Sequence, residues 1–560
     1  MKRLSILMLT LILCLVAGLA LADEKCGPNL TWTLSDAGVL TIQGTGPMDS
    51  YSYGSGIPWK DQRDNIKSVV IEEGVTSIGE YAFYWCRNLT TVSLPESVAS
   101  IGQYAFENCS KLVSLNIPTG VTVIPKWCFY GCKALNSLTL PEGLTTIEEL
   151  AFADCESILE LTIPASVVSI SDDRVFKGCD RLAGINVAVG NPSYISVDGV
   201  LYNADQTILM CYPAGKAIPS FTVPQSVTSI AAYAFYWNEN ITSITIPNTV
   251  TTIGNDAFAG CSKMTSINFA EGLVSIGNTA FHQCRSLTTI VFPASLISLG
   301  DDMFESCSKL TRIEVAEGST AFTSVDGVLF SDDMTTLVAF PPAATKNAYV
   351  IPEGVTTIGE YAFLYNKNLV SITFPSTLIT IGSSAFSGCD KITTIDLPEG
   401  LVSLDYHAFS SCDSLTIVTI PYSCLSLGDG VFDWDEHLTT VNIKNPYTSF
   451  DRWGVFGFCG DALTVYAPAG STAEAHCTEE NIKFVVKAFD VPAPTQEPNT
   501  NAQGNDTWTC PECGTEMNRG KFCFECGTPR PQGQACTNCG YEVPEGMTMK
   551  FCPECGTKLE

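Results

Sequence analysis

The chain has 560 residues, 45% of them hydrophobic, and a formal net charge of −29. Leucine, isoleucine, valine and phenylalanine are plentiful enough for a long continuous core. The acidity argues against nucleic-acid binding and against docking on anionic membranes, because both require a basic surface. We interpret the charge chiefly as a source of solubility.

Residues 1–22 have the features of a signal peptide. Lys2 and Arg3 precede an apolar run over residues 4–16, and a small-residue cleavage motif ends at Ala22. The run is short for a membrane anchor, so we expect cleavage after Ala22, with an uncleaved anchor as the alternative. No second hydrophobic span follows, which predicts a secreted or cell-surface protein with no membrane span in the mature chain.

Residues 23–65 precede a long repetitive region and contain Trp32, a glycine-rich turn region and the pair Pro58-Trp59. The ends of a repeat array must be covered, because an open core edge invites association. We therefore predict an N-terminal cap over this segment.

The repetitive region, residues 66–470, is defined by a phenylalanine that returns with a basic step of 23 residues. It occurs fourteen times, at Phe83, Phe106, Phe129, Phe152, Phe176, Phe235, Phe258, Phe281, Phe304, Phe363, Phe386, Phe409, Phe432 and Phe456. Two steps of 24 and two of 59 interrupt the series, and 59 is one unit plus a 36-residue insertion. The period predicts a solenoid of about 14 coils, because one unit can bury its apolar face only against its neighbours.

A single repeat unit predicts the path of one coil. Alternating apolar residues from Leu89 to Leu94 predict a strand, which Pro95 ends. A second short extended stretch ends at Gly102, and a tight turn then brings Phe106 into the core. The expected fold is mainly β, with stacked parallel strands joined by short turns or helical segments.

A cysteine follows the repeat phenylalanine by three positions in eleven units: Cys86, Cys109, Cys132, Cys155, Cys179, Cys261, Cys284, Cys307, Cys389, Cys412 and Cys459. Asn238, Asn366 and Asp435 replace it elsewhere, so the position suits a small side chain that interacts with backbone groups of the neighbouring coil. We interpret these cysteines as buried structural thiols. Disulfides are the alternative in an exported protein, although side chains stacked in register fit disulfide geometry poorly.

Two insertions, near residues 191–217 and 319–347, share one pattern. Asp198-Gly199 in the first and Asp326-Gly327 in the second lie between apolar flanks, which is the strongest short signal for a β-hairpin. Each insertion then ends in an aromatic–proline pair. A hairpin protruding at these two places could contact a partner, and a spacer without a ligand is the alternative.

Two short segments follow the repeats. Ser471 and the residues after it have the pattern of a capped helix start, which predicts a C-terminal cap over residues 471–487. Residues 488–507 are rich in proline, asparagine, threonine and glutamine, and we expect them to form a disordered linker.

The last segment, residues 508–560, contains four Cys-x-x-Cys pairs: Cys510/Cys513, Cys523/Cys526, Cys536/Cys539 and Cys552/Cys555. Each pair is followed by glycine, and two such knuckles supply four thiolates to one tetrahedral ion. The segment resembles a double zinc ribbon, with one Zn²⁺ site from the first four cysteines and another from the last four. Four thiolates leave no position for water, so both sites would be structural. Disulfides and a rubredoxin-like iron site are the alternatives.

Roughly residues 26–485 resemble the BspA-like leucine-rich-repeat proteins. The similarity lies in the pattern Leu-x-x-Ile-x-Ile-Pro-x-x-Val-x-x-Ile-Gly-x-x-Ala-Phe-x-x-Cys, the Val-Asp-Gly-Val hairpins and the tryptophan-containing N-terminal segment. The resemblance implies an exported protein of a family in which several members are linked to adhesion to host matrix proteins or to other bacteria. It identifies no ligand.

We expect no enzyme activity and no catalytic residues. The four histidines, His282, His407, His437 and His476, lie in different coils or caps, and none accompanies a nucleophile or phosphate-loop motif.

The outward strand positions indicate the kind of partner. They are small and rich in hydroxyl and amide groups: Ser93, Asn116, Thr139, Thr162, Asn186, Thr245, Asn268, Thr373, Asp396, Thr419 and Asn442. Such a face suits a protein or glycan on a host or bacterial surface, with a merely solvated face as the alternative. The first hypothesis is a monomeric, non-catalytic, adhesin-type interaction protein. The second is a structural or assembly scaffold in which the zinc ribbons recruit a partner and the solenoid is a spacer.

Overall fold

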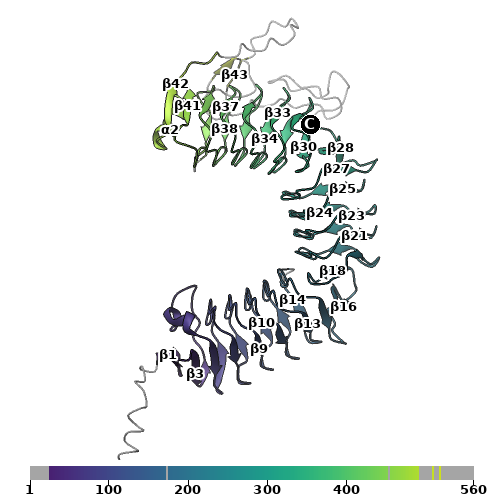
Figure 1. Ribbon diagram of the computed structural model, residues 1–560, viewed down its shortest axis with the longest axis vertical. Helices are drawn as coiled ribbons and strands as arrows, with labels where there is room; N and C mark the ends of the chain where they lie inside the picture. Colours follow the sequence, from purple (N-terminus) through teal and green to yellow (C-terminus); the bar gives the residue numbers. More distant parts are fainter. Residues whose placement is uncertain (1–23, 172–173, 452–453, 491–506, 510–515, 519–560) are drawn as a thin grey trace, which may run out of the picture. The chain divides into compact units, whose positions relative to one another are not determined.

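The computed structural model describes residues 24–171, 174–451, 454–490, 507–509 and 516–518. The chain divides into two compact units, Met1–Asp490 and Val491–Glu560, which are described separately. The first unit is a parallel β-solenoid of about 18 turns with almost no helix. Its strands follow one another in chain order, from purple through teal to yellow-green in Figure 1. The expected solenoid of mainly β coils is thereby confirmed.

The first turn precedes the phenylalanine repeat. It consists of β1 (Glu24–Gly27), β2 (Leu30–Leu34), β3 (Val39–Gly44), β4 (Gly46–Pro47) and the 3-10 helix η1 (Lys60–Asn65). β1, β2 and β3 are antiparallel, and β3 then pairs in parallel with the first regular coil. Trp59 covers the end of the core, because its ring stacks on Phe83 at 5.7 Å and its Nε1–H donates to the Ala82 carbonyl at 2.8 Å.

Each regular coil contributes two strands, which we call the longer and the shorter strand, although in the first coil both have four residues. In the first part of the solenoid the longer strands are β5 (Ser68–Ile71), β7 (Thr91–Ser93), β9 (Ser114–Asn116), β11 (Ser137–Thr139), β13 (Glu160–Ile163) and β15 (Gly184–Val187). The shorter strands are β6 (Val75–Ile78), β8 (Ser100–Ile101), β10 (Val123–Ile124), β12 (Thr146–Ile147) and β14 (Ser169–Ile170).

The middle part repeats this arrangement. Its longer strands are β19 (Ser220–Thr222), β21 (Ser243–Ile246), β23 (Ser266–Phe269), β25 (Thr289–Phe292) and β27 (Arg312–Val315), and its shorter strands are β20 (Ser229–Ile230), β22 (Thr252–Ile253), β24 (Ser275–Ile276) and β26 (Ser298–Leu299). Equivalent residues of neighbouring coils pair in parallel with the repeat as the register; Ile244, for example, lies opposite Ile267. Inward-facing side chains therefore pack against the side chains at equivalent positions of the neighbouring coils. The repeated apolar pattern thus forms the whole core.

The last part has the longer strands β31 (Ala348–Val350), β33 (Ser371–Thr373), β35 (Thr394–Asp396), β37 (Ile417–Ile420), β39 (Thr440–Ile443), β41 (Thr464–Ala467) and β42 (Lys483–Val486). The shorter strands are β32 (Thr357–Ile358), β34 (Thr380–Ile381), β36 (Ser403–Leu404), β38 (Ser426–Leu427) and β40 (Ser449–Phe450). The predicted helix is present as α2 (Thr472–Glu479), where Ser471 Oγ accepts a hydrogen bond from the Glu474 N–H at 3.3 Å.

The repeat phenylalanines form a stacked column inside the solenoid. Neighbouring rings lie nearly parallel, as in Phe106–Phe129 at 5.6 Å and Phe258–Phe281 at 5.5 Å. The turn that carries each ring is tight, and at thirteen of the fourteen rings the residues two before and two after the phenylalanine adopt positive φ, for example 56° at Tyr81.

The insertions are built into the solenoid and do not protrude as free hairpins. The first contains β16 (Tyr194–Val197), β17 (Val200–Asn203) and β18 (Ile208–Cys211); the second contains β28 (Phe322–Val325), β29 (Val328–Ser331) and β30 (Thr336–Ala339). Asp198 and Gly199 both have positive φ, 51° and 77°, as a tight two-residue hairpin turn requires. The hairpins nevertheless belong to the sheets, because β18 pairs with β20 and β30 pairs with β32. The residues of β17 and β29 are mostly buried.

Each insertion also supplies an aromatic ring that restarts the column. Tyr212 stacks on Phe235 at 4.9 Å, and Phe340 stacks on Phe363 at 4.8 Å. The two insertions are thus coils in their own right. Together with the first turn and the turn that carries β41, they account for the difference between the expected 14 coils and the observed count.

The column is interrupted before each insertion, and the described apolar residues fall into three core clusters. We call the corresponding parts the first block (through the coil of Phe176), the second block (from the coil of Tyr212 to that of Phe304) and the third block (from the coil of Phe340 onward). The first seam joins the first and second blocks, and the second seam joins the second and third. Of the second unit, the structure describes an antiparallel pair, β43 (Thr507–Thr509) and β44 (Glu516–Asn518).

Candidate interaction surface

The longer strands arrange their outward side chains in rows that cross each block. Nine of the eleven residues predicted for this face are exposed: Ser93, Asn116, Thr139, Thr162, Asn186, Thr245, Asn268, Thr373 and Asp396. Parallel register places them one above another, as with Thr245 beside Asn268 and Asp396 beside Thr419. A small polar strand face is therefore present in all three blocks.

The prediction was wrong for Asn442, which is buried, and Thr419 is half-buried. The cause is Lys487, just after β42, whose Nζ donates to Asn442 Oδ1 at 2.9 Å. Asn442 Nδ2 in turn donates to Thr419 Oγ1 at 3.4 Å. The C-terminal end of the third block is thus covered by its own chain.

The sequence-based list also missed aliphatic members of the same rows. Val291 is 50% exposed and Val350 is 69% exposed, and they lie beside Glu314 and Thr373 respectively. Counting one repeat forward from Asn268 or back from Thr373 would have found both valines. The face is consequently a mixture of polar and aliphatic side chains.

Many hydroxyl groups near this face hydrogen-bond within the scaffold. At the start of the longer strands, threonine Oγ1 atoms donate to the carbonyl of the equivalent residue one coil earlier. The described cases are Thr90 to Lys67, Thr242 to Pro219, Thr265 to Thr242, Thr311 to Thr288, Thr416 to Thr393 and Thr439 to Thr416, at 2.8–3.1 Å. These hydroxyls stabilise coil stacking, so a ligand would find fewer free donors than the composition indicates.

The repeat cysteines form a second internal ladder, parallel to the phenylalanine column. In ten of them Sγ donates to the carbonyl of the repeat phenylalanine one coil earlier, at 3.0–3.3 Å. Burial raises the pKa of these thiols, for example that of Cys307 to about 12. The 16 cysteines in the described residues carry free thiols. The prediction of structural thiols bonded to the neighbouring backbone is therefore confirmed.

Two of the three exceptions in the ladder keep the same kind of bond with different chemistry. Asn238 Nδ2 donates to the Pro213 carbonyl at 2.9 Å, and Asn366 Nδ2 donates to the Pro341 carbonyl at 3.3 Å. Asparagine thus occurs where the preceding turn belongs to an insertion and offers a proline carbonyl.

Asp435 is the exception that carries an ionisable group. The side chain is fully buried, and Oδ1 accepts a hydrogen bond from the Cys412 N–H at 2.7 Å. Oδ2 has no partner among the described residues. Burial raises the pKa of this carboxyl to about 9, so it holds a proton at neutral pH.

The described part of the chain contains no cluster of three or more histidine, cysteine, aspartate or glutamate residues arranged to hold a metal ion. His282 lies 3.5 Å from Glu305 Oε2, His407 Nδ1 lies 3.0 Å from the Gly430 carbonyl, and His476 stacks on Phe450 at 4.5 Å. The histidines are not brought together. The eight predicted metal ligands, Cys510, Cys513, Cys523, Cys526, Cys536, Cys539, Cys552 and Cys555, lie outside the described residues.

Within the ranges that the structure describes, none of the helices is both long enough and apolar enough to cross a bilayer. Residues 1–22 lie outside those ranges, so the expected signal peptide stays a prediction.

Comparisons with known proteins agree with the architecture. The family model described as BspA type leucine-rich repeat region matches in six copies, over residues 61–183, 211–336 and 338–460. The double zinc ribbon model matches residues 510–556. No curated protein matches the chain.

Several solved structures are similar. A leucine-rich repeat protein from Eubacterium ventriosum is 27% identical, with a TM-score of 0.44, and the match covers 70% of this chain and 94% of that one. The pneumococcal vaccine antigen PcpA is 17% identical, with a TM-score of 0.40 and coverage of 83% and 98%. A leucine-rich cell surface protein from Faecalibacterium prausnitzii is 21% identical, with a TM-score of 0.30 and coverage of 75% and 94%.

Proposed function

Because this chain belongs to the BspA-type leucine-rich repeat family, we propose that it is a secreted or cell-surface interaction protein without catalytic activity. Its partner would be a protein or glycan on a host or bacterial surface. The observation that carries the proposal is the exposed strand face, whose rows run through all three blocks. Repeat proteins commonly use such extended faces for binding.

The character of this face favours a polar partner with small aliphatic contacts. Exposed threonine and asparagine side chains share the rows with valines such as Val291 and Val350. Interfaces of this mixed composition are typical of protein partners, and the hydroxyl and amide groups also suit sugar hydroxyls. The net charge of −29 argues against nucleic acid as the ligand.

Arginine on the strand face is expected to abolish partner binding without unfolding the solenoid. Thr245→Arg and Thr373→Arg each place a long cation at an exposed position in the second and third blocks, where it obstructs the face sterically. We expect binding of the labelled full-length protein to intact bacterial and host cells to fall at least tenfold, as measured by flow cytometry.

The matched control is Thr478→Arg, at another exposed threonine that lies on α2 and outside the longer strands. It should bind cells like the unsubstituted protein. Equal binding by all three variants would exclude the strand face as the binding surface.

We also propose that the second unit binds two zinc ions through its eight cysteines, as the match to the double zinc ribbon model supports. Four thiolates per ion is the donor set that structural zinc prefers. We expect elemental analysis of protein recovered from culture supernatant to give about two zinc ions per chain, and about one after Cys536→Ser and Cys539→Ser. Fewer than one zinc per chain, together with no free thiols in residues 508–560, would contradict zinc and favour disulfides.

The same tail supports a second candidate function, in which the zinc ribbons recruit the partner and the solenoid is a spacer. Cys523→Ser with Cys526→Ser separates the two candidates, because these positions lie far along the chain from the strand face. Retained cell binding favours the strand face, and lost binding with an intact solenoid favours the tail.

A further inference from the structure

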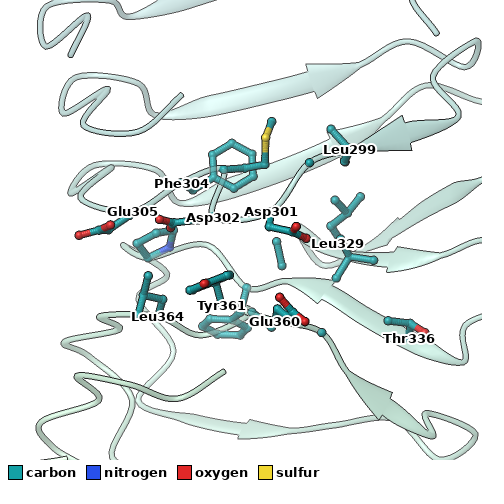
Figure 2. Close-up of a pocket in the computed structure, with 18 residues that line it drawn as sticks. Leu299, Asp301, Asp302, Phe304, Glu305, Leu329, Thr336, Glu360, Tyr361 and Leu364 are labelled. Carbon is teal, nitrogen blue, oxygen red and sulfur yellow. The ribbon is translucent and has the colours of Figure 1, made fainter. Parts of the chain in front are cut away.

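The second seam contains a cavity of about 130 Å³. One wall comes from the last coil of the second block, residues 299–305, and the opposite wall from residues 359–364 of the third block. Figure 2 shows Asp302 and Glu305 on one side of the opening, with Tyr361 and Leu364 facing them. The insertion forms the floor with apolar side chains such as Leu329 and Phe340.

The cavity is acidic and has no internal cation. Asp301, Asp302, Glu305 and Glu360 line it, and none of its lining residues is a lysine or an arginine. Burial and the neighbouring Glu305 raise the pKa of Asp302 to about 7, and His282, which lies 3.5 Å from Glu305 Oε2, partly offsets the charge of both carboxylates. One carboxylate oxygen of Asp302, Oδ1, is buried without a partner among the described residues.

Backbone donors also remain open at this seam. In the preceding coil the Thr279 N–H donates to the Asp301 carbonyl at 2.9 Å, and the Gln283 N–H donates to the Glu305 carbonyl at 2.8 Å. Their counterparts one coil later, the N–H groups of Asp302 and Ser306, have no protein acceptor in the described part of the chain. The insertion does not supply the carbonyls that a regular turn would.

At the first seam a lysine occupies the equivalent place. There Lys177 lies over two tyrosine rings, with Nζ 5.4 Å from the centroid of Tyr233 and 5.1 Å from that of Tyr236. A cation over an aromatic face is a stabilising contact. The repeat aligns Lys177 with Glu305 and Tyr233 with Tyr361. The second seam thus retains one of the two tyrosine rings, that of Tyr361. It has the carboxylate of Glu305 where the first seam has the ammonium group of Lys177.

We propose that the second seam binds an extended peptide segment of a protein partner, whose lysine or arginine side chain enters the cavity beside Asp302 and Tyr361. The partner's carbonyls accept from the open N–H groups of Asp302 and Ser306, as the next turn does in a regular coil. The basic side chain supplies the charge that Lys177 supplies at the first seam. This site rests on the proposed interaction function and specifies the chemistry of one contact.

The test uses the full-length protein and fluorescein-labelled peptides of sequence Gly-Ser-Lys-Ser-Gly, with arginine or norleucine replacing the lysine in two further probes. Fluorescence anisotropy at low ionic strength should give binding at least tenfold tighter for lysine and arginine than for norleucine. Free butylamine should compete only at concentrations at least 100-fold higher than the lysine peptide. No preference over norleucine, or butylamine competing as well as the peptide, would overturn the peptide site.

Two variants probe the cavity and one controls for charge. Asp302→Asn removes the carboxylate whose Oδ1 has no partner among the described residues and which is charged above about pH 7. Glu305→Lys copies the first seam by placing a lysine of the chain itself over Tyr361. Both should weaken binding of the lysine peptide at least tenfold, whereas Asp461→Asn, at an exposed aspartate outside the strand face, should leave that binding unchanged.

Unchanged lysine-peptide binding in Asp302→Asn would overturn the site even if Glu305→Lys fails to fold. A chain that binds cells normally but shows no lysine preference would overturn this site and leave the proposed function intact. Loss of cell binding in Thr245→Arg and Thr373→Arg, with lysine-peptide binding retained, would support both.

Discussion

Phe281→Ala is expected to destabilise the second block by about 3–5 kcal/mol, the usual cost of removing a buried phenylalanine from a packed core. The ring is fully buried and stacks between Phe258 at 5.5 Å and Phe304 at 6.2 Å. Its loss therefore opens a cavity in the middle of the column. Hydrogen exchange followed by mass spectrometry should show faster exchange throughout residues 220–315.

The effect should stay largely within that block, because the described apolar residues form three separate clusters and each coil contacts only its neighbours. Phe458→Ala is the matched control: this phenylalanine is 68% exposed, and its loss should cost less than about 1 kcal/mol. Uniformly faster exchange in all three blocks would contradict the division of the core.

Asp435→Asn is expected to stabilise the third block at pH 7 by about 2–4 kcal/mol, from the difference between the folded pKa and that of an unfolded aspartate. The folded carboxyl has a pKa raised to about 9 by burial, whereas the unfolded side chain titrates near 3.9. Between these values the folded state keeps a proton that the unfolded chain releases. The contribution of Asp435 to the free energy of unfolding is therefore fully present below about pH 4 and is lost as the pH rises towards 9.

Asparagine keeps a donor and an acceptor in the same place and does not ionise, as Asn238 and Asn366 illustrate at equivalent positions. The gain from Asp435→Asn should accordingly disappear near pH 4 and grow up to about pH 8.5, when unfolding by urea is followed at each pH. Asp461→Asn, at an exposed aspartate, should change stability little at any pH. A gain from Asp435→Asn that is the same at all pH values would show that ionisation is not its cause.

Periodicity was sufficient to predict the coil, the inward column and the cysteine ladder, because these depend on contacts between residues one repeat apart. Two features depend on contacts of another kind. Asn442 repeats an outward position, yet Lys487, which follows the last strand, covers it. The insertions look like loops in the sequence, yet Tyr212 and Phe340 take the place of the repeat phenylalanine and draw the hairpins into the sheets.

The cavity at the second seam could not be predicted from the pattern of repeats alone. The acidic lining of the cavity depends on which side chains come into contact where an insertion replaces a regular turn. The aligned positions 177 and 305 differ only in that one is lysine and the other glutamate. Only the structure places them next to the tyrosine of the coil beyond the insertion.

The two insertions have a consequence for how such a chain can change in length. Asp198 and Asp326 occupy the same place in the two hairpins, and they are 128 residues apart, as are Tyr212 and Phe340. A recombination event between these equivalent positions would delete or duplicate one 128-residue module. The new junction would again join a regular coil to an insertion coil, so the reach of the protein could be altered in whole modules while every coil keeps a matching neighbour.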